Sequence, residues 1–199
     1  MEKILEFASR REAEAFKALD ESHVKEIWET AGAEVRLVGS LRMGLLCRHR
    51  DIDLHIYSEG ITEQSSFATM AEIAKNPRII EIKCINGLHT EERCIAWHAK
   101  FKASDDAVWQ LDMIHIEKGT VYDGFFEEMA DRIKALLTPE FRHTILKLKF
   151  DTPEDEEIHG VEYYQGVMEG NATTLDELRR WLVAHRATPS STYWMPSKS

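Results

Sequence analysis

The chain reads Val38-Gly39-Ser40 and, after ten intervening residues, Asp51-Ile52-Asp53-Leu54. Side chains along a strand alternate between two faces, so Asp51 and Asp53 would lie side by side on one face. Two carboxylates that close repel each other unless a positive charge compensates them. Mg²⁺ is the usual compensating ion, because it prefers carboxylate oxygens together with the oxygens of a bound phosphate. The Gly39-Ser40 pair adds a backbone turn and a hydroxyl that suit a phosphate, so these segments predict a phosphate-and-metal site.

Length and charge narrow the class of protein. The chain has 199 residues and is 43% hydrophobic, which suits one sizeable domain, with or without an appendage. Its 25 Lys and Arg face 35 Asp and Glu, a net charge of −10 that weighs against non-specific binding of long nucleic acid. Three arginines nevertheless lie close to the carboxylates in the sequence, where a triphosphate would need positive charge: Arg42, Arg48 and Arg50.

The sequence shows no clear pattern for metal-binding or disulfide-forming cysteines, for a signal peptide or for a membrane span. The three cysteines have no CxxC spacing, so neither a zinc cluster nor a disulfide framework is expected. The charged segment Met1–Glu6 lacks the apolar run of a signal peptide, and no window approaches the roughly 20 apolar residues of a membrane span. We therefore expect a cytoplasmic protein that does not enter a membrane.

Hydrophobic periodicity predicts a core of mixed helices and strands followed by a helical third. The expected helices and strands are helix 2–31, divided near 20–22; strands 34–40 and 51–57; helix 62–75; strands 79–85, 93–101 and 108–116; and helices from 122 to about 187, with starts at 151–154 and 174–177. We expect three parts: a core over 1–119, a helical region over 120–187 that closes the cleft, and a loosely ordered tail over 188–199. Tyr193-Trp194-Met195 in that tail is an alternative docking patch.

A third carboxylate, Asp112, stands in the otherwise apolar stretch Gln110–Ile114. A buried strand does not tolerate an unpaired carboxylate, so Asp112 needs a cation, a hydrogen-bonding partner or an exposed face. On a strand beside Asp51 and Asp53 it would complete a two-metal site. One ion would then hold a triphosphate and the other would lower the pKa of an attacking hydroxyl.

With these residues, the chain resembles the DNA polymerase beta-like nucleotidyltransferase superfamily over about residues 34–116. The signature is an apolar residue, Gly, Gly or Ser, a spacer, Asp-x-Asp and a later Asp on another strand; it is matched by Gly39, Ser40, Asp51, Asp53 and Asp112. The resemblance implies an α/β (α+β) fold with a mixed sheet flanked by helices. It also implies transfer of a nucleoside monophosphate from an NTP, dependent on Mg²⁺ or Mn²⁺, with release of pyrophosphate.

The resemblance also implies a role for each matched residue. Gly39 and Ser40 would hold the triphosphate, and Asp51 and Asp53 would bind the metals shared with it. Asp112 would bind the catalytic metal and help to activate the acceptor.

The arginines are less well determined by the motif. Arg42, Arg48 and Arg50 are candidates to neutralise phosphate charge, Arg42 and Arg50 foremost, but the motif does not say which one does so. Arg50 also departs from the pattern, because many small members have Ser just before the first Asp. The subfamily, and with it the acceptor, stays open.

Histidines and tyrosines offer further candidates. His55 shares the strand face of Asp51 and Asp53 and is a candidate substrate contact, whereas His115 lies opposite Asp112 and is expected to be structural. His98 carries no signal above background. The segment Tyr163–Gln165 is a candidate acceptor pocket, with helix packing as the default.

Our working hypothesis is a nucleotidyltransferase that acts on a hydroxyl of a small molecule or protein, with long nucleic acid the least expected acceptor. Two alternatives stay open. One is a catalytically silent nucleotide sensor that uses the same cleft. The other is an antitoxin-like regulatory partner that acts through protein contacts.

Overall fold

A five-stranded mixed sheet forms the centre of the protein. The computed structural model describes residues 2–186 and 194–197. The strand order is β1-β2-β5-β4-β3, in which β2 and β5 run parallel and all other neighbours antiparallel. The strands are β1 (Glu34–Leu37), β2 (Asp51–Ser58), β3 (Ile79–Asn86), β4 (Cys94–Lys102) and β5 (Val108–Glu117).

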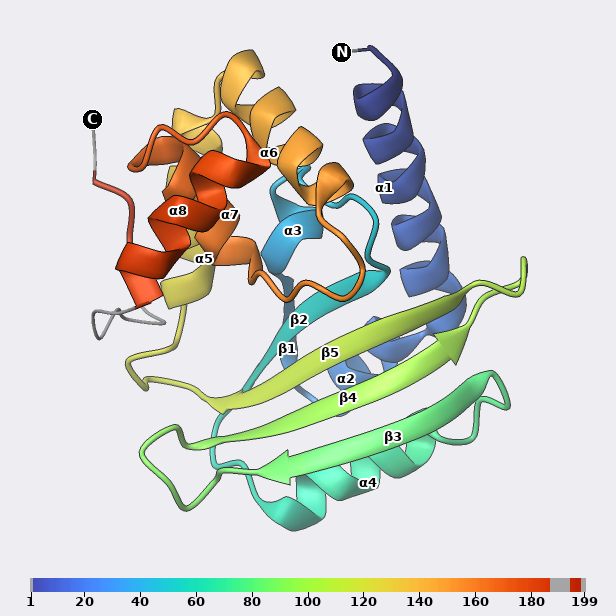
Figure 1. Ribbon diagram of the computed structural model, residues 1–199. Coiled ribbons are helices and arrows are strands. Elements are labelled where there is room, and N and C mark those ends of the chain that lie inside the picture. Colours follow the sequence, from blue (N-terminus) through green and yellow to red (C-terminus); the bar gives the residue numbers. More distant parts are fainter. Residues whose placement is uncertain (1, 187–193, 198–199) are drawn as a thin grey trace.

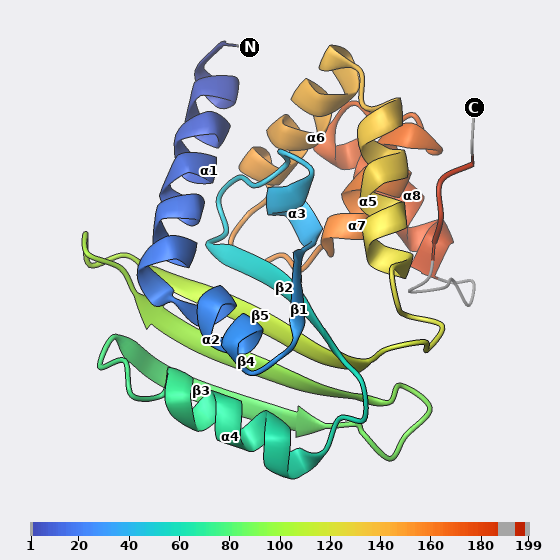
Figure 2. The same cartoon turned by 180° about the vertical axis from the view of Figure 1, so that it is seen from behind.

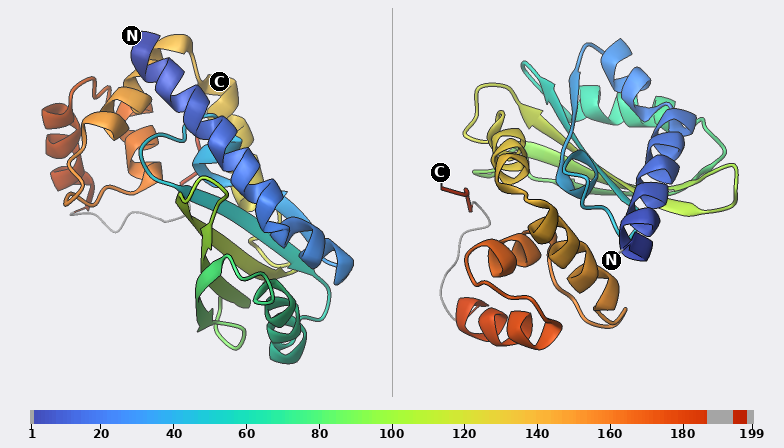
Figure 3. Two further views of the ribbon diagram at one scale, coloured as in Figure 1. Left: turned by 90° about the vertical axis from the view of Figure 1, so that its right-hand side faces the viewer. Right: turned by 90° about the horizontal axis from the view of Figure 1, so that it is seen from above.

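Helices lie on both sides of this sheet. They are α1 (Glu2–Ser22), α2 (Val24–Thr30), α3 (Gly39–Arg42), α4 (Glu63–Ile73), α5 (Phe125–Leu136), α6 (Pro139–Asp151), α7 (Gly160–Met168) and α8 (Leu175–Arg186). Helices α2 and α4 cover one face, which is nearest the viewer in Figure 2, and α6 to α8 stand on the opposite side (Figures 1 and 3). The predicted α+β class with a mixed, helix-flanked sheet is confirmed.

Two hydrophobic cores hold this arrangement together. The first joins the sheet to α1, α2 and α4, and includes Trp28, Ile52 and Trp109, each at most 1% exposed. The second joins the C-terminal helices to the loop after α3, through residues such as Leu45 and Ile145. The segment from Gly39 to Asp53 lies between them, because Leu41 and Ile52 belong to the first core whereas Met43 and Leu45, just after α3, belong to the second.

Several predicted boundaries hold for clear local reasons. The expected division of the first helix falls at His23, whose left-handed φ of 57° separates α1 from α2. The predicted helix start at 174–177 is present as a reciprocal pair of bonds, from the Glu177 amide to the Thr174 hydroxyl and from the Thr174 amide to the Glu177 carboxylate.

Two boundaries differ from the prediction. Strand β1 ends at Leu37 rather than at residue 40, because Gly39 has φ +66° and opens the one-turn helix α3. The predicted helix start at 151–154 is also wrong. Helix α6 runs to Asp151, residues 152–159 are not helical, and α7 begins only at Gly160. Glu154 forms an ion pair with Arg48 instead of beginning a helix.

The described end of the chain packs on the helical region. Trp194 is 8% exposed, and its indole N–H donates to Glu169 Oε1 at 2.8 Å. The carbonyl of Pro196 accepts from Arg132 Nη1 at 3.1 Å. Residues 194–197 therefore contact the helical region, while Tyr193 and the rest of 187–193 lie outside the described residues. The loosely ordered tail expected over 188–199 stays a prediction. Within the described chain, no helix combines the length and apolar character needed to cross a membrane.

Candidate active site

The structure brings the three predicted carboxylates to one cavity. In the parallel pair β2–β5, Asp53 stands directly opposite Asp112, and Asp51 precedes Asp53 by two residues on the same strand face. All three side chains line a cavity of about 570 Å³ between the sheet, α3 and the C-terminal helices. Asp51 and Asp53 thus share one face of β2, as side-chain alternation predicted, and the register with β5 places Asp112 beside them.

Burial and mutual repulsion make this carboxylate group electrostatically unfavourable. Burial, together with the nearby charges of Asp112 and Asp51, raises the pKa of Asp53 to about 7. Burial likewise raises the pKa of Asp51, with Asp112 adding to the effect. The ammonium of Lys149 opposes both shifts but does not cancel them. The three carboxylates therefore have less positive charge beside them than their own negative charge requires.

Asp112 is held by two neighbours on the sheet. His98 of β4 lies directly across from it in the register, and its Nδ1 is 2.5 Å from Asp112 Oδ1. Gln110 Nε2 donates to the same oxygen at 2.9 Å. His98, which shows no signal in the sequence, therefore belongs to the site. Only the pairing of β4 with β5 brings it there.

Gly39 is required by its contact with Asp53. A Cβ atom on Gly39 would lie 1.9 Å from Asp53 Oδ2, far inside van der Waals contact, and its φ of +66° is one that other residues rarely adopt. The strand before it is tied to the same residue, because the Val38 amide donates to the Asp53 carbonyl at 2.9 Å. The Gly-Ser turn and the Asp-x-Asp strand therefore pack as one unit.

Lys149 is a cavity residue that sequence reasoning missed. It lies near the end of α6, and its Nζ donates to Ser40 Oγ at 2.8 Å and to the Leu45 carbonyl at 3.0 Å. Tyr164 of α7 completes this cluster, with its hydroxyl 2.9 Å from Ser40 Oγ and 3.3 Å from Lys149 Nζ. Tyr164 was a candidate pocket residue, and it does line the cavity. The sequence pattern placed Lys149 only on a helix.

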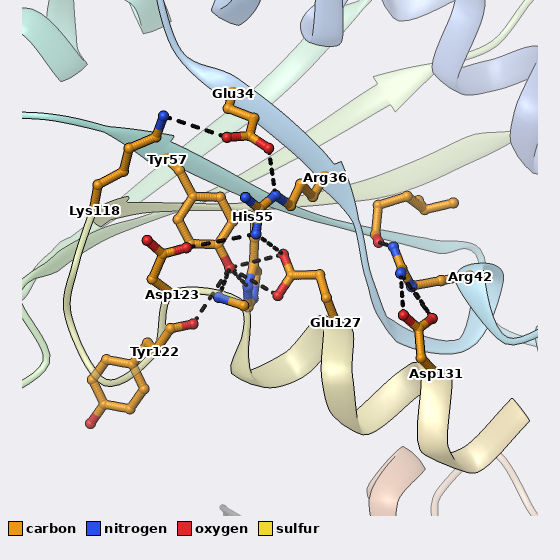
Figure 4. Close-up of polar contacts among 12 residues, drawn as sticks. Glu34, Arg36, Arg42, His55, Tyr57, Lys118, Tyr122, Asp123, Glu127 and Asp131 are labelled. Atoms are coloured by element: carbon orange, nitrogen blue, oxygen red, sulfur yellow. Dashed lines mark hydrogen bonds and ion pairs between the residues drawn. The ribbon is translucent and has the colours of Figure 1, made fainter. Parts of the chain in front are cut away.

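The arginines are positioned differently from the prediction. Arg42 forms an ion pair with Asp131 of α5 at 2.9 Å and donates to the Leu37 carbonyl, as Figure 4 shows, and it does not line the cavity. Arg50 is exposed and is also absent from the cavity lining. Arg48 does line the cavity, and its guanidinium also pairs with the exposed Glu154, which does not. Neither position supports the predicted phosphate role: Arg42 pairs with an acid of α5 that the local sequence could not reveal, and Arg50 is exposed.

The two central histidines take the faces that strand alternation predicted. His55 lines the cavity, with its ring edge-on to Phe126 at 5.0 Å between centroids, and burial lowers its pKa to about 4. His115 is on the other side of the sheet, where Ser66 and Ser58 hold its two ring nitrogens at 3.0 Å each. His115 is therefore structural.

The donor set suits Mg²⁺, although the side chains do not form a finished cage. Within the described residues, no three His, Cys, Asp or Glu side chains are gathered closely enough to hold a metal ion as they stand. The chemistry nevertheless fits, because Asp51, Asp53 and Asp112 are hard oxygen donors on one cavity wall. The raised pKa of Asp53 shows that a compensating cation would relieve their repulsion.

Comparison with known proteins addresses the fold. No protein-family model and no curated protein sequence matches the chain. A solved structure of the Cid1 poly(U) polymerase with MgGTP bound is similar, with a TM-score of 0.56 and 18% identity over 80% of this chain and 50% of that one. The chain shares the nucleotidyltransferase fold.

Two further structures agree with this assignment. A cytoplasmic RNA terminal U-transferase matches with a TM-score of 0.53 and 16% identity, and Cid1 in complex with the UTP analogue UMPNPP with 0.53 and 14%. Each match covers 84% of this chain and 54% of the other. The chain thus spans about half the length of these proteins. These matches confirm the expected nucleotidyltransferase-type fold.

Proposed function

We propose that the chain is a metal-dependent nucleotidyltransferase that moves an NMP from an NTP to an acceptor hydroxyl and releases pyrophosphate. One observation carries the proposal: Asp51, Asp53 and Asp112 share one cavity with the Gly39-Ser40 turn. The fold supports it as well, because similar structures include one with MgGTP bound and one with a UTP analogue.

The nucleotide is assigned to the cavity between the sheet and the C-terminal helices. Its volume of about 570 Å³ is in the range of pockets that enclose one small ligand. Lys149 Nζ and Ser40 Oγ, which already contact each other, are the natural partners of the triphosphate. Phe126 and Met129 of α5 line the same cavity, which supports the expectation that the helical region closes the cleft.

The chain's own residues would divide the work as follows. When bound to the three carboxylates, Mg²⁺ supplies charge neutralisation for the triphosphate and lowers the pKa of the attacking hydroxyl. Lys149 adds a fixed positive charge beside the phosphates. His98 and Gln110 occupy Asp112 Oδ1, so Oδ2 is the oxygen left to accept a hydrogen bond from the acceptor hydroxyl. In the reaction, the acceptor oxygen would form a bond to the α-phosphorus and give its proton to Asp112 Oδ2, while the bond between the α-phosphorus and the oxygen of the departing pyrophosphate breaks.

The acceptor is proposed to be a hydroxyl on a small molecule or a protein. The net charge of −10 disfavours a long polyanion. Similar structures are nevertheless those of a poly(U) polymerase and an RNA terminal U-transferase, so RNA belongs among the acceptors tested.

The test is a screen of the four NTPs with Mg²⁺ or Mn²⁺ against metabolites, proteins and short RNA, read as pyrophosphate release and acceptor mass shift. Asp53→Asn should lower turnover by several orders of magnitude, because it removes one metal ligand. The exposed Asp20→Asn is the matched control and should retain turnover. Equal pyrophosphate release from Asp53→Asn would refute the assignment, and nucleotide binding without turnover by the unmodified chain would indicate a sensor.

A further inference from the structure

One polar side chain in the cavity wall has no part in the mechanism above. His55 lies two residues after Asp53 on the same face of β2 and is 6% exposed. Behind it, away from the carboxylates, is a row of buried polar groups that joins β2 to α5 (Figure 4). Tyr57 in this row is fully buried, and Glu127 is 7% exposed.

The direction of the hydrogen bonds in this row follows from Glu127. The Tyr57 hydroxyl oxygen lies 2.9 Å and 3.0 Å from the two carboxylate oxygens of Glu127. A carboxylate can only accept, so the phenol donates its proton to Glu127. Arg36 lies 3.9 Å from the carboxylate and 4.6 Å from the centre of the Tyr57 ring, where its positive charge compensates the buried acid.

The Tyr57 oxygen is therefore left as an acceptor toward the Gly124 amide and the His55 ring. It receives the Gly124 amide at 3.4 Å and faces His55 Nδ1 at 3.2 Å. Because the phenol proton is already used, Nδ1 must carry the hydrogen in this contact. In a neutral imidazole the second nitrogen, Nε2, is then bare and can only accept.

Nε2 is free to meet a ligand. No described residue provides it with a hydrogen bond, and the ring lines the cavity next to Phe126 and Ile114. Residues two apart on a strand are separated by about 7 Å. That spacing matches the step from a phosphate held near Asp53 to the sugar of the same nucleotide.

We propose that Glu127, acting through Tyr57, fixes the tautomer of His55 so that Nε2 accepts a hydrogen bond from a sugar hydroxyl of the bound nucleotide. His55 is then a specificity residue that favours a nucleotide carrying that sugar hydroxyl over the form that lacks it, and Tyr57 and Glu127 are positioning residues. The inference rests on the proposed function, because it takes the nucleotide to lie beside Asp53.

The tautomer can be measured without any ligand. In nitrogen NMR of the ¹⁵N-histidine-labelled protein, His55 should show a protonated Nδ1 and an unprotonated Nε2 at neutral pH. Tyr57→Phe keeps the ring but removes the acceptor for Nδ1, so both tautomers should then be populated. An unprotonated Nδ1 in the unmodified chain would overturn the proposal.

The sugar contact is tested by calorimetry with MgATP, its 2′-deoxy form and its 3′-deoxy form. Loss of one hydrogen bond predicts that ATP binds about three- to tenfold more tightly than one of the deoxy forms. His55→Phe should bring that ratio close to one. His89→Phe, at a histidine outside the cavity lining, should leave it unchanged. An unchanged ratio in His55→Phe contradicts the contact, whereas a chain that binds no nucleotide contradicts the proposed function itself and leaves the NMR result to judge the tautomer.

Discussion

Replacing Asp53 by Asn is expected to stabilise the protein in the absence of metal at alkaline pH. Burial, reinforced by the charges of Asp112 and Asp51, raises the pKa of Asp53 from 3.8 to about 7. The folded protein therefore holds a buried, uncompensated charge above pH 7. Asn has nearly the same shape and carries no charge, so it removes this unfavourable interaction.

The magnitude follows from the pKa difference between the folded and unfolded chains. Between pH 4 and pH 7 the folded state binds a proton that the unfolded state has lost, so the free energy of unfolding falls as pH rises through this interval. A shift of about three units corresponds to about 4 kcal/mol at pH 8. Part of this belongs to the coupled carboxylates rather than to Asp53 alone, so about 4 kcal/mol is an upper bound for the substitution.

The assay is urea unfolding of the unmodified and Asp53→Asn proteins with EDTA, from pH 4 to pH 8. The two free energies of unfolding should be similar near pH 4 and should diverge in favour of the variant toward pH 8. Asp20→Asn, at an exposed position, should follow the unmodified protein throughout. Added Mg²⁺ should raise the stability of the unmodified protein more than that of Asp53→Asn. Parallel pH profiles for the two proteins in EDTA would refute the electrostatic reasoning.

Three further substitutions test other parts of the site. Gly39→Ala should lower the melting temperature and abolish nucleotide binding measured by calorimetry, because its Cβ would collide with Asp53; unchanged values would contradict this. Lys149→Met should weaken MgATP binding at least about tenfold, while Lys147→Met, at an exposed ion pair on the same helix, should not; equal effects would exclude a specific phosphate contact. Trp194→Ala should cost about 3 kcal/mol in denaturant unfolding, and a loss near zero would show that residues 194–197 do not stabilise the helical region.

The sequence alone determined what depends on short-range geometry. Strand alternation placed Asp51, Asp53 and His55 on one face of β2 and His115 on the opposite side of the sheet, because a side chain's face depends only on its position in the strand. The spacing of the Gly-Ser turn and the Asp-x-Asp pair could likewise be read directly from the sequence, and with Asp112 it carried the resemblance that implied the fold class. These properties are local, so they can be read without knowing what packs against the strand.

Tertiary structure decided which distant residues complete the cavity. Lys149 reaches Ser40 across 109 positions in the chain, and His98 reaches Asp112 only through the register of β4 with β5. Arg42 beside the motif instead turns to Asp131 of α5. A side chain's charge can be read from the sequence, but its partner depends on how helices and strands pack. For this reason the sequence predicted the carboxylates, whereas only the folded chain identified the cation beside them.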